Sequence, residues 1–451
     1  MLDALLVKLN YEPVLSVDRE FDLGTAYLAA ALRRQGYAVE IIDASLEELS
    51  LSQTMARIQG SPARVIGFSV WLHRLVAASE VLIAKLRSAG VTSHITVGSH
   101  SPTFLYKELL LHNLGLDSVV CGEGEWTLLE LVERVCRGKP LNDIAGLAVR
   151  ENGEVTLKLR PAVCELDDLA PPALDYLPHI KRRGQFMSIL TSRGCYGRCT
   201  FCSTSPFYRA GGGKPWRAHS PERVLSEIAA LHAQGIRHFG WRDDNFIGPG
   251  RAGRERARQI AELLLKNKLQ ISFYLACRVD DVDRELFALL KEAGLKRVFL
   301  GVESLSARRL AAFNKLVTVE ENYRAMQVLG ELQIPYTLGY IMLAPDTTWA
   351  EYRESSTRLA KVQRTVPGAA DALQDAYGAV EILPGTDIAE QLRGAKKLRG
   401  DHRAYGYRFQ DPRVRLLHGV VSTLRALTRP LARKIAAAVR EERRREMRGE
   451  E

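Results

Sequence analysis

The sequence has no apolar run of the roughly 20 residues that a membrane-spanning helix needs. It opens on Met1–Lys8, a strand-like stretch without the basic start and small-residue cleavage site of a secretory signal. Cysteine is scarce, with seven in 451 residues, and this odd number does not suit a disulfide framework. We therefore expect a cytoplasmic protein with no membrane partner.

The positive charge of the chain is concentrated at its C-terminal end. Residues 391–451 hold 17 Lys or Arg against seven Asp or Glu, whereas residues 1–390 hold 46 of each. Glutamates interrupt the basic stretch Arg440–Arg448 and no aromatic residues alternate with it, which argues against a nucleic-acid partner and favours a solvated helix. An acidic electron carrier such as flavodoxin is another candidate partner for this end.

Three of the seven cysteines lie within eight positions, in the spacing C-x3-C-x-aromatic-C. They are Cys195, Cys199 and Cys202, with Phe201 as the aromatic residue. Three thiolates without a nearby fourth suit a [4Fe–4S] cluster in which one iron stays open for a substrate or cofactor. Gly194, just before the run, helps a short loop to curl around such a cluster.

A zinc site is the alternative for this run. His219 or a water would have to supply the fourth ligand, because a structural zinc needs four close ligands. His219 lies well downstream of the cysteines, however, which favours the cluster.

Residues 1–145 alternate between apolar strands and helices. This alternation is typical of a doubly wound parallel sheet, whose ligands lie beyond the carboxyl ends of the strands. The residues that follow three of the strands are therefore candidates for ligand contacts. The expected strands are 4–9, 38–42, 65–70, 94–97 and one that begins at 119, and the expected helices are 23–35, 77–88 and 126–136.

The rest of the chain divides into three segments. Residues 146–185 form a connector, with a predicted hairpin around Asn152-Gly153. Residues 186–385 are predicted to form a partial (β/α)6 barrel, with its reacting groups at the carboxyl ends of the strands. Residues 386–451 are expected to form a small, helical and basic cap. The expected barrel strands are 187–191, 238–242, 270–276, 297–302 and 336–343.

Charged residues stand at the expected ends of the barrel strands. Asp243 and Asp244 follow the second strand, Arg278 ends the third and Glu303 ends the fourth. The barrel geometry would bring such side chains to one mouth. A carboxylate at a strand end can instead cap the following helix, and that alternative stays open.

The cysteine run resembles the cluster loop of radical S-adenosylmethionine enzymes. In that family the open iron binds the amino and carboxylate groups of S-adenosylmethionine, and one electron cleaves this molecule to methionine and a 5′-deoxyadenosyl radical. The resemblance implies that Cys195, Cys199 and Cys202 ligate the cluster. It also implies that Asp243 or Asp244 meets the amino group of S-adenosylmethionine.

Further cofactor contacts follow from the same resemblance. Glu303, within Gly301-Val302-Glu303-Ser304, matches the place where the family contacts the ribose or the methionine part. Phe201 and Arg278 are taken as further cofactor-binding residues. The resemblance also implies an electron donor of the flavodoxin or ferredoxin type.

Residues 1–145 resemble the cobalamin-binding domain fused in front of many such enzymes. The matching pieces are Leu23–Ala30, the glycine turn after the fourth strand and the Gly-Glu-Gly-Glu element at 122–125. The sequence has no Asp-x-His-x-x-Gly, and members without it bind cobalamin with its base detached. A scaffold with an empty pocket is the alternative. The residues implied to contact cobalamin are Ser69, Gly98, Ser99, Gly122 and Glu123.

These resemblances imply an enzyme that abstracts hydrogen from an unactivated carbon of a small natural-product substrate and then transfers a methyl group from cobalamin. Residues 313–315 (Phe-Asn-Lys) and 339–348 resemble a branch that includes tailoring enzymes of antibiotic pathways. The alternative is cobalamin-independent loss of water from a vicinal diol of an aminoglycoside-type intermediate. Asp243, Asp346 and Glu381 could attract a cationic aminosugar to the barrel mouth. A non-catalytic cofactor-binding or sensory module is the remaining class.

Overall fold

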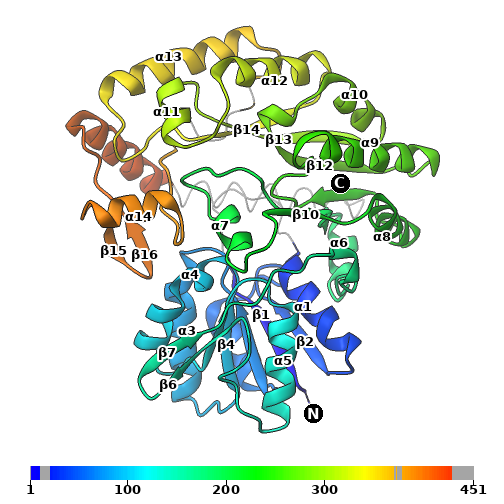
Figure 1. Cartoon of the computed structure of the whole chain (residues 1–451), viewed down its shortest axis with the longest axis vertical. Helices are drawn as coiled ribbons and strands as arrows, with labels where there is room; N and C mark the ends of the chain where they lie inside the picture. The colour runs from blue at the N-terminus through cyan, green and yellow to red at the C-terminus, as the bar shows by residue number, and fades with distance from the viewer. Residues whose placement is uncertain (1, 11–20, 370–371, 373–377, 429–451) are drawn as a thin grey trace.

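The computed structural model describes residues 2–10, 21–369, 372 and 378–428. Figure 1 shows two lobes, an N-terminal one in blue and cyan and a second one in green and yellow. A seven-stranded sheet in the order β2-β1-β3-β4-β5-β6-β7 forms the N-terminal lobe, with the first five strands parallel. Its strands are β1 (Ala4–Lys8), β2 (Val39–Asp43), β3 (Val65–Ser69), β4 (His94–Gly98), β5 (Ser118–Val120), β6 (Leu147–Glu151) and β7 (Glu154–Leu157).

Alternation along β1 explains why helices cover both faces of this sheet. Ala4 and Leu6 belong to one apolar core together with residues of α1 and α5, whereas Leu5 and Val7 belong to a second core with residues of α3 and α4. A central strand buried on both faces is typical of a doubly wound fold, which confirms the predicted fold class. The helices of this lobe are α1 (Leu23–Arg34), α2 (Leu51–Gln59), α3 (Leu75–Ser88), α4 (His100–His112) and α5 (Glu125–Cys136).

The predicted hairpin around Asn152-Gly153 extends the same sheet. Strand β6 pairs antiparallel with β5 and with β7. Asn152 and Gly153 have φ angles of 50° and 84°, the left-handed conformations that an Asn-Gly turn adopts readily. Helix α6 (Leu177–Arg183) then leads into the second lobe.

The second lobe is an open barrel of five parallel strands in the order β14-β13-β12-β11-β8. A parallel bridge between Leu343 and Ala379 continues the strand pattern beyond β14. The strands are β8 (Met187–Ile189), β11 (His238–Trp241), β12 (Ser272–Arg278), β13 (Leu295–Glu303) and β14 (Tyr336–Tyr340). The helices are α8 (Pro221–Ala233), α9 (Gly250–Lys266), α10 (Arg284–Glu292), α11 (Ala307–Ala312), α12 (Val319–Glu331) and α13 (Trp349–Thr365).

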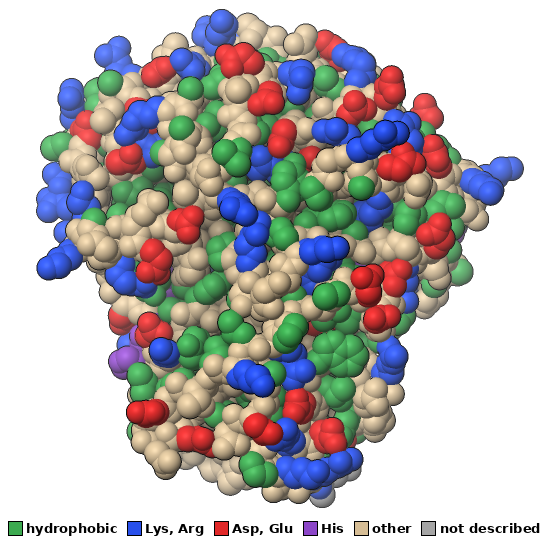
Figure 2. All heavy atoms as spheres, viewed as in Figure 1, with side chains coloured by type: hydrophobic (Ala, Val, Ile, Leu, Met, Phe, Trp, Pro, Cys, Tyr) green, Lys and Arg blue, Asp and Glu red, His purple; other side chains and the backbone are tan. Residues whose placement is uncertain are grey.

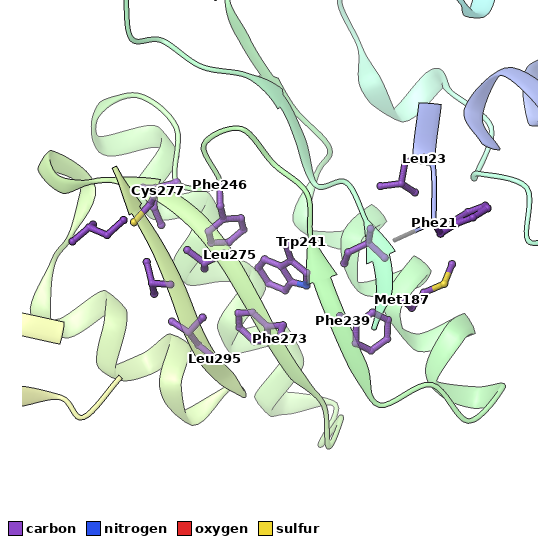
Figure 3. Close-up of a cluster of buried hydrophobic side chains, with 14 of the residues drawn as sticks. Phe21, Leu23, Met187, Phe239, Trp241, Phe246, Phe273, Leu275, Cys277 and Leu295 are labelled. Atoms are coloured by element: carbon purple, nitrogen blue, oxygen red, sulfur yellow. The ribbon is translucent and has the colours of Figure 1, made fainter. Parts of the chain in front are cut away.

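The barrel core is aromatic and continues into the first lobe. The rings of Trp241 and Phe273 stack with their centroids 4.0 Å apart. Figure 3 shows these two rings followed by Phe239 and Met187, with Phe21 and Leu23 of the N-terminal lobe in the same cluster. Burial of these side chains stabilises the fold by about 1.5–3 kcal/mol for each one fully buried. The shared core therefore holds the lobes in contact.

A short hairpin that the sequence predictions missed lies between the two lobes. Strand β9 (Ser192–Gly194) pairs antiparallel with β10 (Trp216–Ala218). The chain between these strands contains the cysteine run and α7 (Thr204–Arg209), which Figure 1 shows at the junction of the lobes. The cysteines therefore lie where the two lobes meet.

The described C-terminal region is helical, as predicted, but it also contains a hairpin. It comprises α14 (Asp387–Gly394), β15 (Arg399–Asp401), β16 (Ala404–Gly406) and a helix from residue 412 that continues to 428. Between β15 and β16, the His402 Nε2 and Arg403 Nε atoms contact the two carboxylate oxygens of Glu80 on α3. The β15–β16 hairpin is thus bound to the first lobe. The predicted solvated helix at Arg440–Arg448 lies outside the described residues.

Two further properties concern the apolar character of the helices and the charge of the surface. Within the described residues, no helix is long and apolar enough to cross a membrane. On the face shown in Figure 2, acidic and basic side chains are interspersed. This face therefore carries no extended field of one sign.

Candidate active site

Two glycines shape the loop that carries the cysteines. Gly194 has a φ of +86°, and a Cβ added to it would lie 2.0 Å from the carbonyl oxygen of Pro215. A Cβ on Gly197 would lie 2.8 Å from Nη1 of Arg278. Any larger residue at either position would push the loop away from β10 or from Arg278, in agreement with the role predicted for Gly194.

The three cysteine thiols are half-buried and surrounded by N–H donors. The Gly197 N–H points to Sγ of Cys195 at 3.4 Å, and Nη1 of Arg278 lies 4.0 Å from Sγ of Cys199. Burial raises the pKa of Cys195 to about 12 and also raises the pKa values of Cys199 and Cys202, so coordination to iron has to displace their protons. Sulfur ligands with N–H donors nearby fit an iron–sulfur cluster.

His219, the fourth ligand in the zinc alternative, is engaged elsewhere. Its Nδ1 lies 2.9 Å from Oδ1 of Asp167, which belongs to the chain between the lobes. Burial lowers the pKa of His219 to about 4 despite this contact. In the part of the chain that the structure describes, no group of three or more His, Cys, Asp or Glu is placed to hold a single metal ion.

Asp243 and Asp244, adjacent in sequence, have different surroundings. Oδ1 of Asp243 accepts hydrogen bonds from the N–H and Oγ1 of Thr191 and from Oγ of Ser192, at 2.6–3.0 Å. Asp243 is almost fully buried, and burial raises its pKa. Asp244 instead lines a cavity, where it accepts from the Gly194 N–H at 3.1 Å. Asp243 therefore anchors the approach to the cysteine loop, and Asp244 is the one of the pair that faces ligand space.

Glu303 sits in a strained backbone conformation at the carboxyl end of β13. Its φ is +62°, and the pairing with β14 shifts register between Gly301 and Glu303. This bulge aims the carboxylate at Lys315, whose Nζ lies 3.1 Å from Oε1. Burial lowers the pKa of Lys315, but Glu303 and Cys199 more than offset this effect and leave the pKa raised. Lys315 belongs to a motif that was recognised in the sequence, but its place in the site was not predicted.

Arg278 connects the strand ends to the cysteine loop. Its guanidinium bonds to both carboxylate oxygens of Asp280 and to the carbonyl oxygen of Lys315. The same group lies over the ring of Tyr196, 5.1 Å from its centroid. Because these contacts hold Arg278 beside Cys199, it is suited to stabilise a charged group at the loop.

Phe201 packs away from the polar site. Its ring meets Phe313 edge-on, with the centroids 5.0 Å apart, and borders an apolar cluster that includes Ile388. The predicted cofactor contact by Phe201 is untested, and its observed contacts fix the far side of the cysteine loop.

A cavity of about 660 Å³ opens at the carboxyl ends of the first sheet. Both lobes contribute to its wall, because Leu190, Arg193 and Asp244 of the second lobe line it as well. A Cβ on Gly122 would meet nothing within 4 Å, so backbone forms the wall there and leaves room for a close ligand. All five residues implied to contact cobalamin line this cavity: Ser69, Gly98, Ser99, Gly122 and Glu123.

The carboxylate of Glu123 is nevertheless occupied by protein groups. It pairs with Arg193 and Arg217, which lie on β9 and β10. Burial raises the pKa of Glu123, but the two guanidinium groups more than offset this and hold the pKa below its usual value. The sequence analysis missed both arginines. The only feature of the sequence that could have pointed to these arginines is that they flank the cysteine run.

The acidic groups proposed to attract an aminosugar are paired too. Asp346 contacts Arg308 and Arg309, and Glu381 contacts Arg74. These two carboxylates are paired with arginines, and the third, Asp243, is buried and bonded to Thr191 and Ser192, which weakens the electrostatic argument for a cationic substrate.

Comparisons with known proteins agree with this geometry. Residues 189–359 match the model of the radical SAM superfamily, and residues 17–132 match that of the B12 binding domain. An uncharacterized methyltransferase of Pyrococcus horikoshii is 32% identical over 345 residues, which are 75% of this chain and 72% of that protein. The 4′-phospho-dehydrooxetanocin synthase of Priestia megaterium is 30% identical over 71% of this chain, but the match spans only 46% of that longer protein.

A solved structure has the same fold. It is the cobalamin-dependent S-adenosylmethionine radical enzyme OxsB with aqua-cobalamin and S-adenosylmethionine bound, with a TM-score of 0.80 and 23% identity over 98% of this chain and 71% of that one. The chain belongs to the radical SAM superfamily, in the group with a B12 binding domain, and is a radical SAM enzyme whose cofactors are a [4Fe–4S] cluster, S-adenosylmethionine and cobalamin.

Proposed function

We propose that this enzyme methylates an unactivated carbon of a small natural-product substrate. One observation carries the proposal: a single cavity is lined both by the glycine-rich strand ends of the first lobe and by Asp244, which is bonded to the start of the cysteine loop. When bound, the cluster and S-adenosylmethionine supply a hydrogen-abstracting radical, and cobalamin supplies the methyl group. A substrate in this cavity would lie between the two sources.

The residues of the loop have distinct roles in this proposal. Cys195, Cys199 and Cys202 ligate the cluster. Asp244 accepts a hydrogen bond from the amino group of S-adenosylmethionine, since it faces the cavity and keeps acceptor capacity beyond its bonds to Gly194 and Thr204. Asp243 serves this contact indirectly, by holding the turn before the loop.

Two strand-end residues orient the rest of S-adenosylmethionine. Glu303 accepts a hydrogen bond from S-adenosylmethionine through Oε2, since Lys315 engages only Oε1. The cluster and its thiolate ligands together carry a negative charge. Arg278 stabilises this charge, because the Arg278 guanidinium is fixed beside Cys199. An external reductant of the flavodoxin or ferredoxin type has to supply the electron.

At the first sheet, Gly98 and Gly122 give backbone access to the corrin ring, and Ser69 and Ser99 border it. Similarity to the hopanoid C-3 methylase of Methylococcus capsulatus supports the methyl-transfer chemistry. No contact in the described site specifically favours loss of water from a diol.

The test is anaerobic reconstitution followed by turnover with methyl-deuterated S-adenosylmethionine and a reductant. The proposal expects one cobalt per chain, release of 5′-deoxyadenosine and a deuterated methyl group on the product. Full turnover by cobalt-free enzyme, with a product lighter than the substrate by one water, would establish the dehydratase alternative instead.

A further inference from the structure

Glu123 is the centre of a buried ion-pair network between the lobes. Nη1 of Arg193 donates to Oε1 at 2.8 Å, and Arg217 donates to Oε2 at 2.8 Å and to Oε1 at 3.1 Å. The Val163 N–H adds a fourth bond to Oε2 at 3.0 Å. An ionised carboxylate accepts about four hydrogen bonds, so Glu123 has no capacity left for a ligand.

The two arginines are cross-strand neighbours on the hairpin that carries the cysteine loop. Arg193 and Arg217 are paired residues in the β9–β10 ladder, and Cys195 follows Arg193 by two positions. One carboxylate therefore clamps both strands at the point where the chain enters the loop. A clamp here limits the positions that Cys195 can adopt.

Arg193 is held by further groups of the first lobe. Its Nη2 donates to Oε1 of Glu125 at 2.6 Å, and its guanidinium lies 5.1 Å from the centroid of the Tyr27 ring on α1. The side chains of Arg193, Glu123 and Glu125 are all at most 7% exposed. Removing one partner from such a buried pair leaves an uncompensated charge, so the contacts act together.

The same turn forms part of the cavity wall. Gly122 and Gly124 line the cavity, and a Cβ on Gly124 would lie 3.0 Å from Cδ2 of Leu28. The turn is thus packed against α1, with its backbone toward ligand space and its carboxylates toward the hairpin. A shift of the turn on one side must be transmitted to the other.

We propose that the Gly122–Glu125 turn couples the two cofactor sites: Glu123 and Glu125 are positioning residues for the cysteine loop, and occupancy of the cavity by cobalamin and assembly of the cluster favour each other. The inference rests on the proposed function in one respect, the residence of cobalamin in this cavity. Linkage requires the coupling to be reciprocal, so it can be measured from either cofactor.

The experiment measures the affinity of the full-length chain for hydroxocobalamin by anaerobic equilibrium dialysis, once with the cluster assembled and once after iron has been removed by a chelator. The wild-type protein is expected to bind about fivefold more tightly, or better, with the cluster present, which is the low end of usual couplings. In Glu123→Gln this ratio should fall toward one.

Glu133→Gln is the matched control, because Glu133 lies on α5, the helix that follows the Gly122–Glu125 turn, but pairs with Arg137 at the surface. It should keep the wild-type ratio. Glu125→Gln removes a single bond to Arg193 and replaces Glu123→Gln if the latter does not fold; its ratio should also fall.

A wild-type ratio of one, or the wild-type ratio retained in Glu123→Gln or in its substitute, would overturn the coupling while leaving the proposed function intact. Failure of the wild-type protein to bind cobalamin at all would overturn both.

Discussion

The carboxyl ends of the two sheets present different kinds of chemical groups. At the N-terminal sheet, glycine backbone at 98 and 122 forms part of an open cavity wall. At the barrel, the strand ends carry Asp243, Arg278 and Glu303, each of which is already held by neighbouring side chains or backbone. In both sheets the strand ends are where ligands generally bind. The first sheet presents bare backbone there, whereas the barrel presents charged side chains that are already held in place.

This difference corresponds to the ligands that we propose for the two edges. A wide macrocycle needs close approach over a large area, which residues without side chains allow. A small zwitterion and a metal cluster need polar groups that are already oriented, so that little reorganisation follows binding. Four predictions test whether the two edges can be disabled separately.

The largest effect is expected from Cys199→Ala. Loss of one of three sulfur ligands should leave the cluster without stable attachment, so iron content and 5′-deoxyadenosine formation should fall to background. The cavity of the first lobe should still take up cobalamin, at the lower affinity expected of the cluster-free protein. Cys164→Ala is the control, since Cys164 is an exposed free cysteine outside the site. Normal iron content together with continued cleavage of S-adenosylmethionine would contradict the assignment of Cys199.

Gly98→Leu should disable the opposite edge. A Cβ at Gly98 would already lie 3.3 Å from Val120, so the remaining atoms must enter the cavity or displace β5. Overpacking of this kind costs about 1–3 kcal/mol, which, taken from the binding free energy, would weaken cobalamin binding by about fivefold to 150-fold. Iron content should stay normal. Gly419→Leu, where a Cβ meets nothing within 4 Å, is the control; equal cobalamin binding by the two variants would show that Gly98 does not face the ring.

Glu303→Gln tests the contribution of one charged side chain at the barrel edge to the binding of S-adenosylmethionine. Loss of a charge-assisted hydrogen bond should weaken S-adenosylmethionine by about 1–3 kcal/mol in equilibrium binding, with cluster content unchanged. The variant also leaves the buried Lys315 without its carboxylate, which should lower the melting temperature.

The double variant Glu303→Gln/Lys315→Met separates the two effects. It removes the unpaired ammonium group, so stability should be regained while the affinity for S-adenosylmethionine stays low. If affinity returned together with stability, Glu303 would serve only to neutralise Lys315.

The smallest expected effect is a change in thermal stability caused by Glu227. Burial raises the pKa of Glu227 on α8 from its ordinary 4.5 to about 7, against the opposing influence of Arg223. A carboxyl with a raised folded-state pKa contributes stability at low pH that is lost as the pH rises from about 4.5 through about 7. Glu227→Gln should therefore raise the melting temperature by a few degrees at pH 8 and change it little at pH 5. An equal shift at both pH values would exclude ionisation as the cause.

The parts of this molecule that could be predicted from sequence are those with a local signal. The cysteine spacing is contained in eight residues, and the N-terminal strands and helices follow a short apolar period, so both were recognisable. Helix α4 was missed because it starts after Ser99, whose φ of +92° is unusual for a residue other than glycine. Strands β9 and β10 have three residues each, too few for a period to be recognised.

The polar contacts of the site were less predictable, because they join distant positions. Glu123 is 70 residues from Arg193 and 94 from Arg217, and no local pattern links them. Glu123 was predicted from the motif as a cobalamin contact; it lies at the cavity, but its carboxylate is bound to the two arginines. A motif locates a turn, whereas the partners of its side chains depend on how the two lobes assemble.

The contact of His402 and Arg403 with Glu80 has a consequence for the way the chain is made. The paired residues are more than 320 positions apart, so the carboxylate of α3 meets its partners only after the entire barrel has been synthesised. Until then the first lobe carries a charged group in a place that becomes buried. A first lobe expressed alone would lack these two contacts, and we expect it to be less stable than the same residues within the complete chain.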